Sequence, residues 1–420
     1  MLADPTALLA GALFLCAVLY SVQEIQRARG VDYYQFWVMS RAAASPASDS
    51  LYSVETSRQI GLEYLDRARS SPESSRFRDA AEWNQKTNPD VLDPISTPFY
   101  YALLGSIATG DYDRDYRIFQ ALGGVAFVLG LIGLCRIFAY PWPAALLAAT
   151  LVLLWFGPLH SDVQAANVNR LQFAALVASL LLLRRNDARG FFLGGLALAL
   201  LVLFKPNLAF VPVLLIATWA IQGRRRDLKF GTAGLAAGAL LGFLVGSWFL
   251  RSFSSWPDWL GVTRRLLSKP YPIENFNVSL ATLVYSNTGF DPSVWLTLGI
   301  VTSYCACLSR GVLRGDSDLL AIGVGCILPL IAVQIAWDHY FLLTLPLLLY
   351  FLRPESELLE RLLAVAALLL IAQSPLNIVV PLQTAQQVAI GFAISTTTLL
   401  GLTLRAAYSR SRVSTSSSSR

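Results

Sequence analysis

The chain has 420 residues, of which 55% are hydrophobic and only 14% are charged. Soluble globular domains carry about 25% charged residues, so a chain this apolar is predicted to be a polytopic membrane protein. The formal net charge of +6 does not indicate a nucleic-acid-binding protein, because the basic residues form short clusters between apolar runs instead of a patch on a soluble domain.

Apolar runs recur along the whole chain, from about Thr6–Val22 near the N-terminus to about Val388–Leu404 near the C-terminus. Several are shorter than the roughly 20 residues that a helix needs to cross a bilayer, so tilted, broken or partly buried helices are expected. The predicted fold is all-α: a single integral membrane domain over residues 1–420, built as a bundle of about 12 transmembrane helices.

The hydropathy falls over residues 31–117, for which we predict a long extracytoplasmic first loop that carries short amphipathic helices. One such helix has a common apolar face formed by Ile60, Tyr64, Leu65 and Ala68. The sequence leaves open whether the apolar stretch from Pro98 to Thr109 crosses the membrane. A second extracytoplasmic loop is predicted over residues 251–292, and a disordered cytoplasmic tail over residues 409–420.

Basic residues cluster in the short loops between the later apolar runs, and such loops remain in the cytoplasm. The clusters are Arg184-Arg185, Arg224 to Lys229, Arg310 with Arg314, Arg353 with Arg361, and Arg405 to Arg412. The loops that alternate with them are therefore predicted to lie outside, and they contain every polar motif considered below. Arg27 and Arg29, which follow the first apolar run, oppose this topology.

The first polar motif places Asp32 before the aromatic residues Tyr33, Tyr34, Phe36 and Trp37, directly after the first apolar run. A charge at the edge of the hydrocarbon must be hydrated, paired or functional. Asp32 could simply end a helix or hydrate a loop, and the aromatic residues could form an interfacial belt. The functional interpretation is a catalytic carboxylate beside an aromatic wall, with Tyr33 and Tyr34 contacting substrate.

Two further motifs place ionisable residues between apolar runs. Lys205, which precedes Pro206, could extend to the lipid headgroups, or its ammonium could bind a lipid phosphate. Asp338 and His339 could be a mutually satisfied interfacial pair or part of a site, with Tyr340 beside them.

Asn275, Asn277 and Ser279 could bind sugar hydroxyls, although Asn277-Val278-Ser279 is also a glycosylation sequon, and Asn167 and Asn169 are further candidates for substrate binding. Glycines recur every fourth residue at Gly234, Gly238, Gly242 and Gly246, which predicts a helix packing seam and no chemistry. The sequence contains no dedicated cluster of metal ligands, and we predict no metal and no cofactor.

Taken in order, these motifs resemble the GT-C class of membrane glycosyltransferases, and most closely glycosyltransferase family 87, which contains polyprenyl-phosphomannose-dependent mannosyltransferases. The resemblance rests on Asp32 to Tyr34, Pro98 to Tyr101, Asn167-Val168-Asn169, Lys205-Pro206, Asn277 to Leu280 and Trp337 to Tyr340. Ala166 and Phe276 stand where the family commonly has glycine.

The resemblance implies an inverting transfer of a sugar, mannose by analogy, from a polyprenyl-phosphate donor to a hydroxyl of a lipid- or envelope-linked acceptor. It implies that Asp32 is the general base and that Lys205 and His339 bind the donor phosphate, with Asp338 orienting the histidine. The expected partners are the lipid-linked sugar, a glycan or glycolipid acceptor and membrane lipids, but no nucleic acid. The expected location is the plasma membrane, with the active site on the extracytoplasmic face.

Two other functions remain open at this point. A lipid flippase or small-molecule transporter also uses intramembrane charges and broken helices, although the sequence contains no convincing internal repeat. A lipid-linked polysaccharide polymerase or ligase would be expected to use extracytoplasmic arginines, for which Arg251, Arg264 and Arg265 are candidates.

Overall fold

The computed structural model describes residues 5–44, 50–71, 74–87, 92, 94–267, 272–273, 277–310, 316–373 and 384–416. Within these ranges the chain is helical, which confirms the predicted all-α fold, and its extended pairing is limited to two isolated bridges. The N-terminal half contains α1 (Pro5–Arg27), α2 (Val31–Ala43), α3 (Val54–Ser70), α4 (Ser75–Thr87), α5 (Pro98–Ile107), α6 (Tyr112–Ile137), α7 (Trp142–Trp155), α8 (Gly157–Ala165), α9 (Asn169–Leu183) and α10 (Ala188–Phe204). The C-terminal half contains η1 (Pro206–Leu208), α11 (Phe210–Ile221), α12 (Arg225–Phe249), α13 (Ser255–Leu267), α14 (Leu280–Thr288), α15 (Ser293–Arg310), α16 (Ser317–Ala332), η3 (Asp338–Thr344), α17 (Leu345–Leu352), α18 (Leu358–Ala372) and α20 (Ala385–Ser416).

Four of the described helices are long and apolar enough to cross a membrane: α1, α6, α12 and α20. The pair α8 and α9 passes the same test together, but it is bent by 119°, as in a broken span or a re-entrant segment. The remaining apolar helices of the described chain have 10–17 residues. These findings confirm a polytopic helical membrane protein with shorter apolar helices, while the count of about 12 spans remains a prediction.

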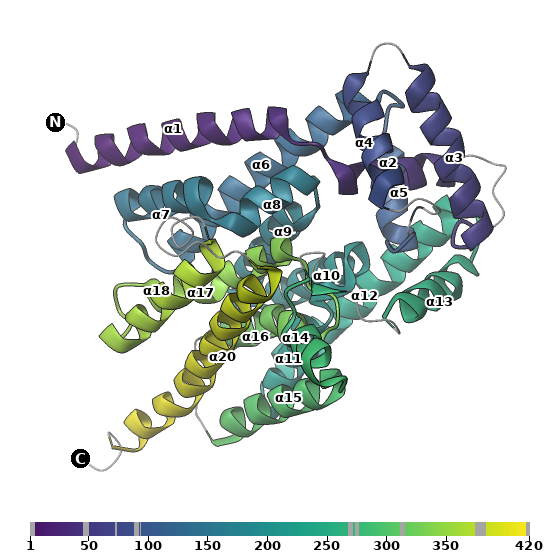
Figure 1. The fold of residues 1–420 in the computed structure, drawn as a ribbon. Coiled ribbons are helices and arrows are strands. Elements are labelled where there is room, and N and C mark those ends of the chain that lie inside the picture. The colour runs from purple at the N-terminus through teal and green to yellow at the C-terminus, as the bar shows by residue number, and fades with distance from the viewer. Residues whose placement is uncertain are drawn as a thin grey trace.

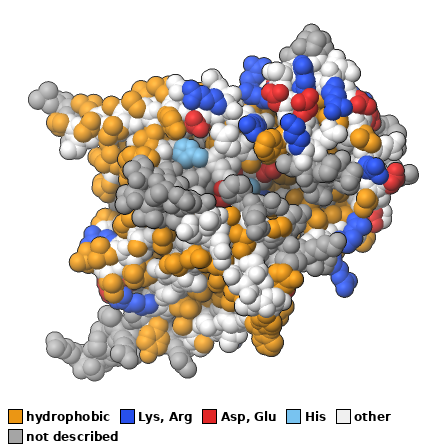
Figure 2. Space-filling model, viewed as in Figure 1, with side chains coloured by type: hydrophobic (Ala, Val, Ile, Leu, Met, Phe, Trp, Pro, Cys, Tyr) orange, Lys and Arg blue, Asp and Glu red, His pale blue; other side chains and the backbone are white. Residues whose placement is uncertain are grey.

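The segment predicted as a long first loop folds into α2, α3, α4 and α5, which lie together at one end of the molecule (Figure 1). The predicted apolar face of α3 is buried there, as expected for an amphipathic helix. α5 has 10 residues and is about 15 Å long, half the thickness of the roughly 30 Å hydrocarbon core, so it cannot cross a bilayer alone. In Figure 2 charged side chains gather over this end, whereas hydrophobic side chains cover much of the rest of that face.

α10 and α12 pack along the predicted glycine seam. A Cβ atom at Gly234 would lie 2.0 Å from the Phe192 carbonyl oxygen, and one at Gly238 would lie 2.5 Å from the Leu196 carbonyl oxygen. Side chains at these positions would force the two backbones apart. The seam therefore fixes α10, and Lys205 directly follows the end of that helix.

Three of the predicted cytoplasmic clusters, those of Arg184, Arg224 and Arg353, meet at one end of the helical bundle. Arg224 forms an ion pair with Asp318 at 2.6 Å, and Asp316 lies within 4.0 Å of Arg184 and 3.4 Å of Arg353. α9 and α10 both run between this end and the polar motifs, because α9 starts at Asn169 and α10 ends just before Lys205. α9 has 15 residues, which separates its two ends by about 22 Å.

α20 continues as a helix through Ser416, and residues 417–420 lie outside the described part of the chain. The disordered tail over residues 409–420 remains a prediction. The predicted second loop contains α13 and α14.

Candidate active site

A tight turn after α1 positions Asp32. Gly30 has a φ of +73°, its N–H donates to the Gln164 carbonyl of α8 at 3.0 Å, and a Cβ atom there would lie 2.3 Å from the Tyr116 ring. Only glycine fits this left-handed, crowded position without strain. Asp32 follows in the first turn of α2, where the helix dipole favours a negative charge.

A break between α8 and α9 supplies the residues that face Asp32. Ala166 has a φ of +54° and ends α8, and α9 begins at Asn169 after a sharp bend. Asn167 lies within this break, and its Nδ2 donates to Asp32 Oδ2 at 2.6 Å. The break therefore brings two regions 135 residues apart into direct contact.

Lys205 joins the same network. Its Nζ donates to Asn167 Oδ1 at 2.7 Å and to Asn169 Oδ1 at 2.9 Å. Because an ammonium only donates and a carboxylate only accepts, both amide orientations follow: each Oδ1 faces Lys205, while the Nδ2 atoms face Asp32 and Asp162. The lysine and Asp32 are thus held on opposite sides of one asparagine.

The position of Lys205 follows from Pro206, which cannot continue α10 and starts η1 instead. The ammonium lies 4.1 Å from the centre of the Tyr340 ring, a cation–π contact. Burial lowers the pKa of Lys205 from 10.5 to about 7, and the negative charges of Asp162 and Asp32 oppose that shift. A bound anion would favour the charged form of this lysine.

His339 also lies close to Asp32. Its Nε2 is 4.0 Å from Asp32 Oδ2 and is buried without a hydrogen-bond partner among the described residues. Its Nδ1 is 3.5 Å from Asp338 Oδ1, which also accepts from Ser161 Oγ at 2.7 Å. Buried nitrogens are normally paired, so this one is a candidate ligand-binding atom.

Asp162 and Arg170, which were not predicted as site residues, form a buried ion pair that contacts the network through Asn169. Arg170 Nε lies 2.8 Å from Asp162 Oδ2, and both side chains are almost fully buried. Asp162 Oδ1 accepts from Asn169, while Arg170 donates to Gln120. The sequence feature that could have indicated this pair is Arg170, because an arginine in the first turn of an apolar helix needs a buried partner.

The other predicted substrate-binding residues lie elsewhere in the packing. Tyr33 and Tyr34 are buried in an aromatic cluster, where the Tyr33 ring lies 4.7 Å from that of Phe119. Burial raises the pKa of the Tyr33 phenol well above its usual range, so that it stays neutral. Asn277 donates to the Gln334 carbonyl at 2.6 Å and accepts from the Ala336 N–H at 2.9 Å, which anchors the segment leading to Asp338. The contact of these three residues with substrate remains a prediction.

Among the described residues no group of three or more histidine, cysteine, aspartate or glutamate side chains is arranged to hold a metal ion. The network consists instead of a carboxylate, an ammonium and an imidazole, joined by two amides. Such a set can accept a proton from a hydroxyl and stabilise an anion.

The fold and this network define an all-α polytopic membrane protein with a polar, charged site between its helices. Compared with models of known protein families, the chain matches glycosyltransferase family 87 over residues 96–375. This match covers about two thirds of the sequence, and the chain belongs to that family and is a glycosyltransferase. Comparisons with curated proteins and with solved structures gave no significant match. The matched region includes Asn167, Lys205 and His339, whereas Asp32 precedes it.

Proposed function

We propose that this glycosyltransferase moves a sugar, mannose by analogy with its family, from a polyprenyl-phosphate donor to a hydroxyl of a lipid- or envelope-linked acceptor, with inversion. The observation that carries the proposal is the bridge from Asp32 through Asn167 to Lys205, with bonds of 2.6 and 2.7 Å. It holds a proton acceptor and a cation close enough to act on one sugar phosphate.

In the proposed reaction Asp32 takes the proton of the acceptor hydroxyl as its oxygen attacks the anomeric carbon. The new C–O bond forms while the bond from that carbon to the phosphate oxygen breaks, and the polyprenyl phosphate leaves with the electron pair. Lys205 and His339 stabilise the negative charge on the leaving phosphate. Asp338, 3.5 Å from His339 Nδ1, orients the imidazole.

Three features of the network suit this division of roles. Asp32 and Lys205 do not neutralise each other by direct contact, because Asn167 lies between them. Lys205 sits in a largely protein-lined environment, where an ammonium interacts more strongly with a phosphate than it would in water. His339 Nε2 has no hydrogen-bond partner among the described residues, so in the protonated imidazole its N–H can donate to substrate without first losing a bond.

We further propose that the site faces the extracytoplasmic side of the plasma membrane. The basic loops and the network lie at opposite ends of α9 and α10, and basic loops remain in the cytoplasm. The segment α5 is too short to cross the membrane, which removes one crossing that would reverse this order.

The direct test uses the full-length protein in nanodiscs with synthetic polyprenyl-phosphate mannose and glucose, a membrane glycolipid acceptor and, as the matched alternative donor, GDP-mannose. We expect transfer only from the polyprenyl-phosphate donors, with the anomeric configuration inverted in the product as determined by NMR. Transfer from GDP-mannose alone, or retention of configuration, would contradict the proposal. Movement of the lipid across liposomes without any transfer product would instead support the transporter alternative.

A further inference from the structure

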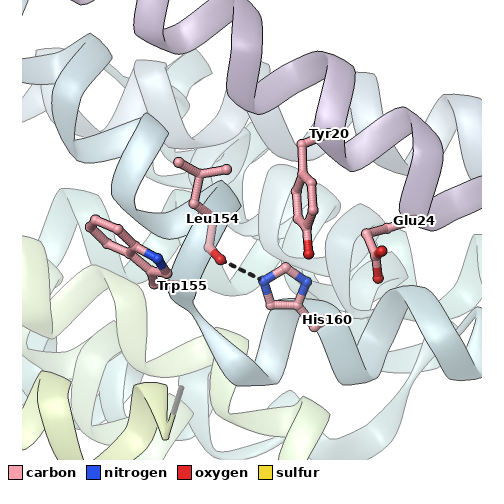
Figure 3. Close-up of a pocket in the computed structure, with 5 residues that line it drawn as sticks. All are labelled: Tyr20, Glu24, Leu154, Trp155 and His160. Atoms are coloured by element: carbon pink, nitrogen blue, oxygen red, sulfur yellow. Dashed lines mark hydrogen bonds between the residues drawn. The ribbon is translucent and has the colours of Figure 1, made fainter. Parts of the chain in front are cut away.

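A surface groove outside the network lies between α1, α7 and α8, and it has a volume of about 490 Å³. It is lined by Tyr20, Glu24, Leu154, Trp155 and His160 (Figure 3). This volume is within the range of roughly 300–1,000 Å³ that is typical of small-ligand sites. The mechanism proposed above uses none of these five residues.

The lining combines exposed aromatic rings with hydrogen-bonding groups. Trp155 is 50% exposed and Tyr20 is 39% exposed, although both belong to otherwise apolar helices. Glu24 contributes a carboxylate, and His160 contributes an imidazole. Aromatic faces pack against the C–H surface of a sugar ring, while carboxylate, hydroxyl and imidazole groups bind its hydroxyls.

His160 is held in a fixed orientation. Its Nε2 is 3.1 Å from the Leu154 carbonyl oxygen, which can only accept, so Nε2 carries the proton. The other ring nitrogen lies on the side of Tyr20 and Glu24 in Figure 3. The Tyr20 ring meets the imidazole edge-on, with 6.1 Å between ring centres. The groove therefore presents a preset arrangement of polar atoms to a ligand.

The negative charge of Glu24 indicates which of the two substrates of a transferase, the donor phosphate or a neutral acceptor sugar, the groove can bind. Glu24 has Arg27 at 3.9 Å, a distant and largely solvent-exposed partner, so the carboxylate would repel the donor phosphate. A neutral sugar meets no such repulsion, and its hydroxyls can donate to the carboxylate. The Lys205 ammonium is the better partner for the donor phosphate.

The elements that line the groove also lead to the site. His160 precedes Ser161, which donates to Asp338, and α1 leads through the Gly30 turn into Asp32. Gly30 in turn donates to Gln164, one turn of α8 beyond His160. The segments that line the groove therefore lead directly into the segments that carry Asp32 and Asp338.

We propose that this groove is the acceptor subsite, binding a neutral sugar of the acceptor with Trp155 against its ring and Glu24, Tyr20 and His160 on its hydroxyls. This inference rests on the proposed function, because a donor and an acceptor must both reach Asp32.

The test measures transfer by full-length protein in nanodiscs, with polyprenyl-phosphate mannose as donor and p-nitrophenyl mannoside, glucoside and galactoside as acceptor probes. Trp155→Ala and Glu24→Gln are expected to raise the acceptor KM at least tenfold and to change the donor KM less than twofold. The matched controls are Trp142→Ala, an exposed tryptophan at the other end of α7, and Glu63→Gln, which also pairs with a nearby arginine. Both controls should leave the acceptor KM unchanged.

Equilibrium binding of the same glycosides and of polyprenyl phosphate separates the two hypotheses. Weaker glycoside binding in the Trp155 and Glu24 variants supports the subsite even if no transfer is detected, a result that would count against the proposed function alone. Unchanged glycoside binding, or equal loss in the Trp142 control, overturns the subsite while transfer by the wild type preserves the proposed function. Weaker binding of polyprenyl phosphate in the Trp155 variant would assign the groove to the donor and overturn the proposal as well.

Discussion

Asn167 connects Asp32 and Lys205 by hydrogen bonds and so joins the two charged residues into one site. Its amide has a donor side and an acceptor side, and the network uses both, with Asp32 on one and Lys205 on the other. A carboxylate or an apolar side chain at this position could not satisfy both neighbours. The geometry therefore depends on this amide as much as on the two charged residues that it joins.

Lys205 gives the site a pH dependence. Its pKa of about 7 means that the free protein loses this cation as the pH rises through neutrality. If the cation binds the donor phosphate, kcat/KM for the donor should fall about tenfold per pH unit above pH 7, because kcat/KM reports the free enzyme. The measurement is a pH profile of kcat/KM between pH 5.5 and 9 with saturating acceptor.

Lys205→Arg supplies the control, because a guanidinium stays charged throughout this range. The variant should lose the falling limb above pH 7, although its different shape is expected to lower the maximal rate. A falling limb that persists in Lys205→Arg would contradict the assignment of this titration to the Lys205 ammonium.

At the scale of elements, the α10–α12 seam connects packing to the site. Gly234→Ala should destabilise the protein by about 1–3 kcal/mol, because the new methyl group would lie 2.0 Å from the Phe192 carbonyl oxygen. The expected result is a lower midpoint of thermal unfolding, together with a higher donor KM, since α10 carries Lys205 at its end.

Gly299→Ala on α15 is the matched control, because an added Cβ atom there meets no atom within 4 Å. It should leave the unfolding midpoint unchanged or raise it slightly, since alanine favours a helix over glycine. Equal destabilisation by both substitutions would show that the seam is not tightly packed.

The seam was predictable from the sequence because glycines four residues apart form a local pattern. The break before α9 was not, since Ala166 adopts its left-handed φ of +54° without any glycine or proline at the turn. Hydropathy also cannot separate an apolar helix in lipid from one inside protein: every residue of α16 except Asp318 is buried, whereas much of α1 is exposed.

In the site, too, local sequence features were predictable and tertiary contacts were not. Asp32, Lys205 and His339 were selectable because a charge between apolar runs is costly and therefore informative. The contact of Asp32 with Asn167 depends on the tertiary fold, which periodicity does not encode. The sequence could not show that Arg170 pairs with Asp162, because that contact also depends on the tertiary fold.

For the whole molecule, the separation of the basic end from the network makes a topological prediction. In a background with Cys16 replaced by serine, cysteines at Glu63 and Thr288 should react with a membrane-impermeant thiol reagent added outside intact cells. Cysteines at Arg185 and Arg225 should react only after permeabilisation. All four side chains are exposed, so the difference between them reports the side of the membrane.

Labelling of Glu63→Cys from the cytoplasm alone would contradict the proposed placement of α2–α5 and, with it, of Asp32. Outside labelling of Arg185→Cys would reverse the whole topology. Either result leaves the helical fold intact and removes the proposed extracytoplasmic site.

The most direct test of the account is the transfer rate of Asp32→Asn, measured with a polyprenyl-phosphate sugar and the purified protein. Asparagine can still accept a hydrogen bond from Asn167 but cannot take a proton, so we expect kcat to fall by roughly 10²–10⁴-fold. The donor KM should stay within about threefold of wild type, and Asp66→Asn, an exposed aspartate on α3, should be fully active. Wild-type transfer by a normally folded Asp32→Asn protein would contradict the central claim that Asp32 is the general base.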